Sequence, residues 1–130
     1  MGTNEMRAYI AAPWVQKEAA IAAADKFKAA GFGVVSKWFE PREGDMHDPE
    51  TFKVQADNDL EELSAADVLV VLNLGKSEGK AVEQGYALAM GIPIVVVGER
   101  SIVNIFQYLD DFRCVSTVEE AIKEAIDVTE

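Results

Sequence analysis

The stretch Asp67-Val68-Leu69-Val70-Val71-Leu72 decides the fold, because it is apolar without interruption after its first residue. A strand that exposes one face alternates apolar and polar residues, whereas a strand buried on both faces reads as a continuous apolar run. Strands of the second kind occupy parallel sheets that are covered by helices on both sides. We therefore expect residues 67–72 to form the central strand of a parallel sheet.

Strand and helix patterns alternate on both sides of this run. Four more apolar segments predict strands at 7–11, 32–36, 93–97 and 112–115. Helical patterns occupy 15–30, 49–65, 81–90, 102–109 and 118–128, and Thr117 is the expected N-cap of the last helix. Residues 37–49 contain two prolines and no period, which predicts a long surface loop. This order predicts a three-layer α/β domain with a five-stranded parallel sheet.

Length and charge limit the classes of function. The 130 residues suit a single domain covering 1–130. A net charge of −11 without a Lys/Arg cluster argues against nucleic acid as a partner. The apolar runs are too short to cross a membrane, and the first residues lack the pattern of a signal peptide, so we expect a cytoplasmic protein with no membrane partner. The isolated His47 and Cys114 have no metal-ligand spacing, so we expect no metal site; His47 is assigned to solvent and Cys114 to the core.

Ligands of open parallel sheets bind beyond the carboxyl ends of the strands. This rule selects 12–14, 38–47, 73–83 and 98–104. Glu83 stands out, because the predicted helix 81–90 places it in the first turn after the central strand. A carboxylate at such a position can attack an electrophilic carbon, or it can merely complement the helix dipole. Both interpretations are open on the pattern alone.

A second group of carboxylates precedes the central strand. Asp57 and Asp59 face differently on a helix, so one of them at most points toward the site. Asp59 with Glu83 would supply the two carboxylates that glycosyl transfer uses. A solvated acidic helix face, formed by Asp57, Asp59, Glu61 and Glu62, explains the same pattern.

The segment Gly75-Lys76-Ser77-Glu78-Gly79-Lys80 has the composition of a phosphate-binding loop but lacks the Walker A order. ATP hydrolysis is therefore not expected. An anion site and a polar turn with two solvated lysines are both compatible with it.

Four blocks stand in consistent order along the chain. They are Tyr9-Ile10-Ala11-Ala12-Pro13-Trp14, Asp57-Asn58-Asp59-Leu60 leading into the central strand, Gly79 with Glu83-Gln84-Gly85-Tyr86-Ala87, and Gly91-Ile92-Pro93-Ile94. The most specific of these blocks contain E-x-G-Y-A and N-D-L. Together the blocks resemble the nucleoside 2′-deoxyribosyltransferase family, which implies a flavodoxin-like (Rossmann-like) fold.

The resemblance implies an N-glycosyl transferase or hydrolase without a cofactor. Glu83 matches the family nucleophile that attacks C1′ and forms a covalent glycosyl-enzyme. Asp59 matches the carboxylate that holds the sugar and assists the base, and Tyr9 matches a tyrosine that orients the nucleophile. The residues expected to bind substrate are Ala12, Trp14, Trp38, Ser77, Gly79 and Asn104, although core packing also explains the aromatic ones.

The resemblance does not decide between several activities. The family includes transferases and hydrolases of 2′-deoxynucleoside 5′-monophosphates, in which Ser77 matches a phosphate-binding serine. Asn104 resembles the asparagine that transferases lend across a subunit interface, which implies a homodimer or larger assembly. Lys76 and Lys80 favour a phosphate, whereas the scarcity of arginines favours a nucleoside. The residues are also compatible with a module that cleaves NAD and with a non-catalytic nucleotide-binding module.

Overall fold

The structure, a computed structural model, describes residues 5–40 and 48–129. His47 and most of the loop predicted at 37–49 lie outside this range. In the described part of the chain, no helix is long and apolar enough to cross a membrane.

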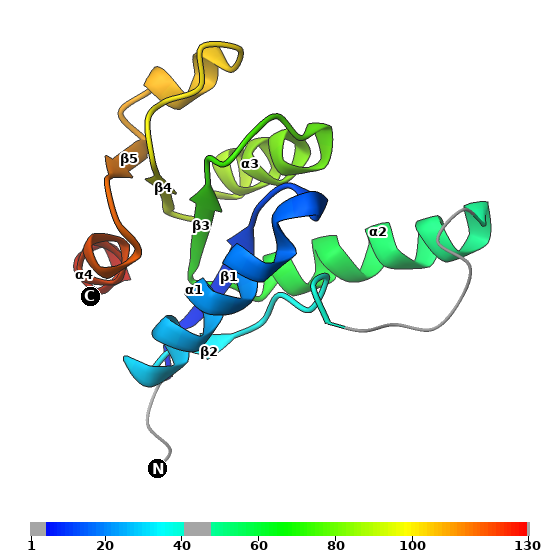
Figure 1. The fold of residues 1–130 in the computed structure, drawn as a ribbon, viewed down its shortest axis with the longest axis horizontal. Helices are drawn as coiled ribbons and strands as arrows, with labels where there is room; N and C mark the ends of the chain where they lie inside the picture. The colour runs from blue at the N-terminus through cyan, green and yellow to red at the C-terminus, as the bar shows by residue number, and fades with distance from the viewer. Residues whose placement is uncertain (1–4, 41–47, 130) are drawn as a thin grey trace.

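Five parallel strands form one sheet in the order β2-β1-β3-β4-β5 (Figure 1). The strands are β1 (Arg7–Ala11), β2 (Gly33–Val34), β3 (Val68–Leu72), β4 (Ile94–Val97) and β5 (Phe112–Val115). β3 lies at the centre, where Tyr9 pairs with Leu69 on one side and Val71 with Val96 on the other. All five of its residues are buried, as the apolar run predicted. This strand order is the flavodoxin-like one, and its direction of winding reverses between β1 and β3.

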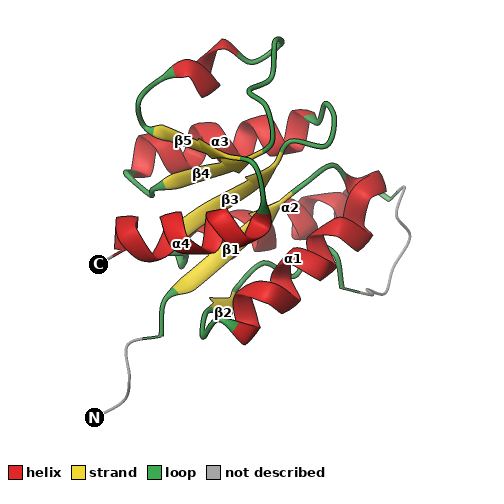
Figure 2. Cartoon of the chain, turned by 60° about the vertical axis from the view of Figure 1, so that its left-hand side comes forward, coloured by secondary structure: helices red, strands yellow, loops and turns green. Residues whose placement is uncertain are grey.

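Helices cover both faces of the sheet (Figure 2). The helices α1 (Lys17–Ala29) and α4 (Val118–Thr129) lie on one face, and α2 (Pro49–Ser64) and α3 (Glu78–Met90) lie on the other. Two short 3₁₀ helices, η1 (Trp14–Gln16) and η2 (Ile105–Tyr108), follow β1 and precede β5. The three-layer architecture predicted from the sequence is confirmed.

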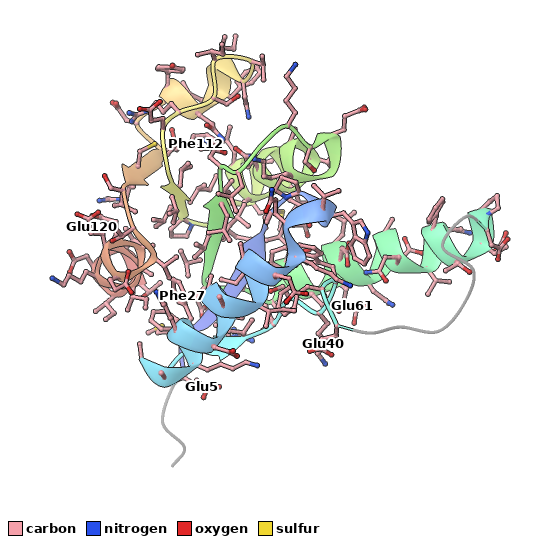
Figure 3. The ribbon with its side chains drawn as sticks, in the orientation of Figure 1. Glu5, Phe27, Glu40, Glu61, Phe112 and Glu120 are labelled. Carbon is pink, nitrogen blue, oxygen red and sulfur yellow. The ribbon has the colours of Figure 1, made fainter. Side chains whose placement is uncertain are left out.

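The core fills the two interfaces between sheet and helices. Its side chains include Phe27 of α1 and Phe112 of β5, both labelled in Figure 3 and both fully buried. Phe27 meets Phe32 edge-on with ring centroids 5.1 Å apart. In contrast, α2 buries only Leu63, and its N-terminal half extends away from the sheet in Figure 1. The C-terminal half of α2 is therefore the part that reaches the rest of the molecule.

Capping residues explain where two helices begin. The Thr117 hydroxyl accepts a hydrogen bond from Glu120 N, and Glu120 Oε1 accepts one from Thr117 N, which is a reciprocal capping box and confirms the predicted N-cap. The predicted start of α3 at residue 81 is wrong, since Ser77 Oγ accepts from Lys80 N and the helix begins at Glu78. The predicted helix 102–109 is also shorter, because only Ile105–Tyr108 is helical, as a 3₁₀ turn.

Candidate active site

A carboxyl and a phenol meet where the winding of the sheet reverses. Tyr9 is the third residue of β1, and Glu83 lies on the helix that follows β3. The Tyr9 hydroxyl donates a hydrogen bond to Glu83 Oε2. In α/β sheets of this winding, the crevice between these two strands is the usual place for a ligand. The structure therefore joins two of the residues selected from the sequence at the position where chemistry is expected.

Burial controls the protonation of this pair. Removal from water raises the pKa of Glu83 from its ordinary 4.5 to about 7; the hydrogen bond from Tyr9 opposes that rise, and the charges of Asp59 and Glu62 add to it. Burial and the Glu83 charge raise the pKa of Tyr9 far above its usual range. Tyr9 therefore remains a donor at all ordinary pH values, whereas Glu83 titrates near neutrality, as catalytic carboxyls often do.

Glu83 does not sit in the first turn of its helix. Because α3 begins at Glu78, Glu83 is in the second turn, beyond the free backbone N–H groups of the helix N-terminus. The effect of the helix dipole on a side chain fades within that first turn. The sequence-based interpretation of Glu83 as a dipole-complementing residue thus loses its geometric basis.

The acidic helix α2 turns one edge toward this pair. Asp59 accepts a hydrogen bond of 2.5 Å from Gln55 Nε2, and its charge acts on both Tyr9 and Glu83. Asp57 is exposed, as expected for a residue that faces away from Asp59. Glu62, three residues after Asp59, lies on the same edge, and burial raises its pKa. Glu62 was assigned to the solvated face from the sequence, although its spacing of three residues from Asp59 places both on one edge of the helix.

Two tryptophans lie beyond the end of β1. Trp38 is 7% exposed and donates its indole N–H to Ile10 O at 2.7 Å, while Trp14 is 46% exposed with its ring centroid 6.1 Å from that of Trp38. Ala12, which directly follows β1, is buried. Packing therefore accounts for Trp38 and for the equally buried Phe39, and Trp14 is the aromatic residue with surface to offer a ligand.

Lys80 serves the fold rather than a phosphate. Its ammonium donates to Gly75 O at 2.8 Å and Asn73 Oδ1 at 3.1 Å, and its side chain is buried under the loop that precedes α3. Burial lowers its pKa. The interpretation of Lys80 as a solvated lysine is wrong, because its side chain is buried and backbone and amide oxygens accept hydrogen bonds from its ammonium. Lys76 is exposed.

Side-chain amides connect this loop to the segment before β5. Gln107 is 1% exposed. Its amide nitrogen donates a hydrogen bond to Gln84 Oε1 at 2.9 Å, and its amide oxygen accepts from Asn73 Nδ2 at 2.7 Å and from Ser101 N at 2.8 Å. Asn104 reaches Gln84 at 3.4 Å. No sequence pattern selected Gln107, since an isolated glutamine carries no periodic signal, and Gln84 stood in the E-x-G-Y-A block only as its variable position.

A pocket of about 620 Å³ lies between the start of α3 and η2. Ser77, Gln84 and Asn104 line it together with Lys76 and several apolar side chains. Tyr9, Asp59 and Glu83 are not among its lining residues, so the structure divides the expected site residues into two neighbouring groups. Gly79 is exposed at the second position of α3, and a Cβ there would meet nothing closer than Ser77 Oγ at 3.9 Å.

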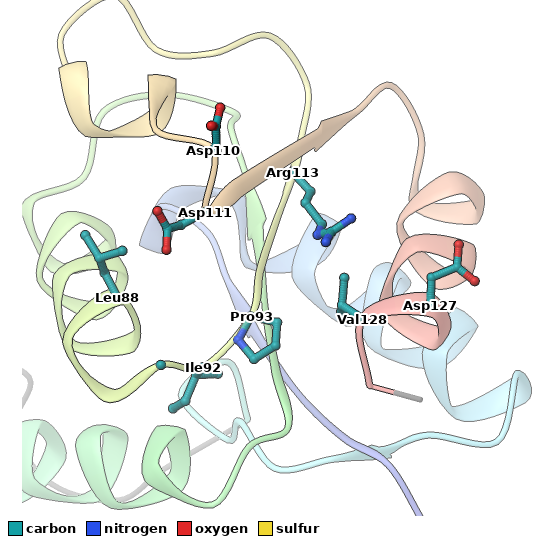
Figure 4. A pocket seen from close by; sticks show the side chains of 9 residues that line it. Leu88, Ile92, Pro93, Asp110, Asp111, Arg113, Asp127 and Val128 are labelled. Atoms are coloured by element: carbon teal, nitrogen blue, oxygen red, sulfur yellow. The ribbon is translucent and has the colours of Figure 1, made fainter.

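The opposite edge of the sheet carries a second pocket, of about 380 Å³ (Figure 4). Asp110, Asp111, Arg113 and Asp127 are its charged residues. It lies at the amino ends of β4 and β5, where ligands of such sheets are not expected. Within residues 5–40 and 48–129, no three His, Cys, Asp or Glu side chains are arranged to hold a metal ion.

The sheet order and the buried acid at its winding reversal define a flavodoxin-like α/β domain with a carboxyl-based site. The family model described as nucleoside 2-deoxyribosyltransferase matches residues 8–117. The chain belongs to this family, in which N-glycosyl bonds are transferred or cleaved, as the sequence resemblance predicted.

Three solved structures share the fold at low sequence identity. A 2-deoxyribosyltransferase from Bacillus psychrosaccharolyticus superposes with a TM-score of 0.69 at 17% identity, covering 89% of this chain and 90% of the other. A conserved protein from Enterococcus faecalis V583 superposes with a TM-score of 0.65 at 19% identity, covering 95% of this chain and 98% of the other. The Clostridium botulinum CMP N-glycosidase BcmB superposes with a TM-score of 0.57 at 15% identity, covering 94% of this chain and 98% of the other. No curated protein matches the sequence.

Proposed function

We propose that this protein transfers the sugar of a 2′-deoxynucleoside from one nucleobase to another through a covalent glycosyl-Glu83 intermediate. The observation that carries the proposal is the part-buried Glu83 carboxyl, which accepts a hydrogen bond from the Tyr9 hydroxyl and lies near the charge of Asp59. Membership of the family supports the class of bond that is broken. No step requires a cofactor.

Each residue has a defined task in this mechanism. Ionised Glu83 attacks C1′, the C1′–N bond breaks, and its electron pair passes to the base. Asp59 assists the departure of the base by general acid–base catalysis. The transition state carries positive charge on the sugar, which the carboxylates of Glu83 and Asp59 stabilise. Tyr9 holds the attacking carboxylate in one orientation. A second base, or water, then displaces Glu83 from C1′, so that two inversions give retention.

Base exchange tests this proposal directly. Purified protein is incubated with deoxynucleosides, and separately with their 5′-monophosphates, each with and without a second free base, and the products are separated by chromatography. Exchange between nucleosides is the expected result. Glu83→Gln should abolish it, whereas Glu61→Gln, a charge-matched change at an exposed position of α2, should not. Substantial exchange by the Glu83→Gln protein would contradict the mechanism.

The intermediate itself gives a second measurement. Without an acceptor base, intact-mass spectrometry should find the wild-type protein heavier by one deoxyribosyl group, and peptide mapping should place that group on Glu83. The Glu83→Gln protein should gain no mass. A group attached to any other residue would exclude Glu83 as the nucleophile.

A second candidate is hydrolysis of 2′-deoxynucleoside 5′-monophosphates. Ser77 favours it, because its hydroxyl lies at the start of α3 and lines the 620 Å³ pocket beside exposed Lys76. The structural likeness to a CMP N-glycosidase is compatible with it. Release of base from monophosphates alone, with a KM that rises at least tenfold in Ser77→Ala, would establish this activity. Release of nicotinamide from NAD would instead support an NAD-cleaving module, and ligand-dependent melting without any product would support a binding module.

We also infer a homodimer that places Asn104 of one protomer near the substrate of the other. Apolar side chains around Asn104 support this inference, since Ile102, Val103, Ile105 and Phe106 are all exposed. Sedimentation should find a dimer, and Ile105→Glu should yield monomers with reduced turnover. A monomeric, fully active wild-type protein would contradict it.

A further inference from the structure

Glu62 lies between the Tyr9–Glu83 pair and the segment that follows β2. Its Oε1 accepts a hydrogen bond of 3.0 Å from Lys37 N, which fastens α2 to this segment. Its charge acts on the pKa values of both Tyr9 and Glu83. A residue of a solvated helix face would do neither, so Glu62 requires a separate explanation.

The segment held by Glu62 is itself bonded to β1. The Ser36 hydroxyl accepts from Ile10 N at 2.9 Å, and Trp38 donates to Ile10 O at 2.7 Å, so both backbone groups of Ile10 are engaged. Ile10 directly follows Tyr9. The hydrogen bond from Lys37 to Glu62 thus lies between two bonds that fix the strand carrying the phenol.

We propose that Glu62 is a positioning residue of the site: through the hydrogen bond from Lys37 N, its carboxylate anchors residues 36–38 against the end of β1, the strand that carries Tyr9. The inference rests on the proposed function of Glu83. It assigns Glu62 no contact with the reacting atoms.

The electrostatic surroundings support this assignment. The charges of Asp59 and Glu40 raise the pKa of Glu62, and the charge of Lys37, whose backbone N–H donates to Glu62, lowers it. The charged and titratable groups around Glu62 and Glu83 are Tyr9 on β1, Lys37 and Glu40 after β2, and Asp59 on α2. Because a like charge disfavours ionisation and the Glu62 charge raises the pKa of Glu83, removal of that charge should ease ionisation of Glu83.

Two substitutions separate the anchor from the charge. Glu62→Gln keeps an oxygen that can accept from Lys37 N but removes the charge, whereas Glu62→Ala removes both. Glu61→Gln is the matched control, because it deletes the same charge one residue earlier on the exposed side of α2; Figure 3 shows Glu61 near the surface. The ionisation of Glu83 is followed by ¹³C NMR of the side-chain carboxyls, with the signal assigned by its loss in Glu83→Gln.

In Glu62→Gln, the Glu83 midpoint and the acidic limb of the pH–rate profile should both move down by about 0.3 to 1 pH unit. In Glu62→Ala, KM should also rise several-fold, and Glu62→Gln should restore it. A Glu83 midpoint in Glu62→Gln equal to that of Glu61→Gln would overturn the electrostatic role, and an unchanged KM in Glu62→Ala would overturn the anchor. Absence of turnover by the wild-type protein would refute the proposed function, while the NMR midpoint would still decide how Glu62 acts on Glu83.

Discussion

Replacement of Glu83 by glutamine is expected to abolish turnover and to stabilise the fold at alkaline pH. The physical reason is that Glu83 must ionise inside the protein, where burial disfavours its charge. Glutamine has nearly the same shape, and its amide oxygen can accept the hydrogen bond from Tyr9, but it carries no charge to desolvate. The variant therefore keeps the geometry and removes the electrostatic cost.

The magnitude follows from the pKa of Glu83. A rise from 4.5 to about 7 corresponds to about 3 kcal/mol between folded and unfolded states once the carboxyl is ionised in both. Because Glu83 retains partial exposure, we expect about 1 to 3 kcal/mol. The sign is fixed by the direction of the shift: a raised folded pKa favours the folded state below pH 4.5, and this advantage is lost as the pH rises through about 7.

Urea unfolding at pH 5, 6, 7 and 8 measures this difference. The unfolding free energies of wild type and Glu83→Gln should differ least at pH 5, and the variant should be more stable by about 1 to 3 kcal/mol at pH 8. Its Tm at pH 8 should be higher by about 3 to 5 °C per kcal/mol. Glu61→Gln should follow wild type throughout. A difference that does not change with pH, or a less stable variant at pH 8, would refute the reasoning.

Three further substitutions test other parts of the site. Tyr9→Phe should lower kcat by roughly tenfold or more and move the acidic limb of the pH–rate profile upward, because the lost hydrogen bond holds the pKa of Glu83 down. Gln107→Leu should cost about 2 to 4 kcal/mol in urea unfolding, since it removes the hydrogen bonds of a buried amide to Asn73, Gln84 and the Ser101 N–H; a cost below 1 kcal/mol would argue against the network. Ser77→Ala should cost about 1 kcal/mol through loss of the α3 cap, and unchanged thermal melting would contradict that role.

The central strand was predictable because one property, burial on both faces, determines its composition. The short β2 was not: 32–36 was expected, but only Gly33–Val34 pairs with β1. The reason is a side chain, as the Ser36 hydroxyl takes the Ile10 N–H that a longer ladder would use. Competition of this kind is decided in three dimensions and leaves no periodic trace.

The candidate site also has a part that the sequence predicted and a part that it did not. Family blocks selected Tyr9, Asp59 and Glu83, and the structure brings the first and last into contact. The turn on which Glu83 lies was missed, because glycine and lysine before residue 81 resembled loop residues although Ser77 caps a helix there. The inward path of the Lys80 side chain depends on oxygens from β3 and the loop after it, which no local pattern specifies.

The sequestered amine of Lys80 has a practical consequence for chemical labelling. Acylating reagents modify amines that solvent reaches, and every other described lysine is exposed. Lys80 should therefore be the last of them to react, and only when the loop between β3 and α3 opens and releases its ammonium from Gly75 and Asn73. The labelling rate of Lys80 therefore reports the opening of this loop, and mass spectrometry can measure it without any introduced probe.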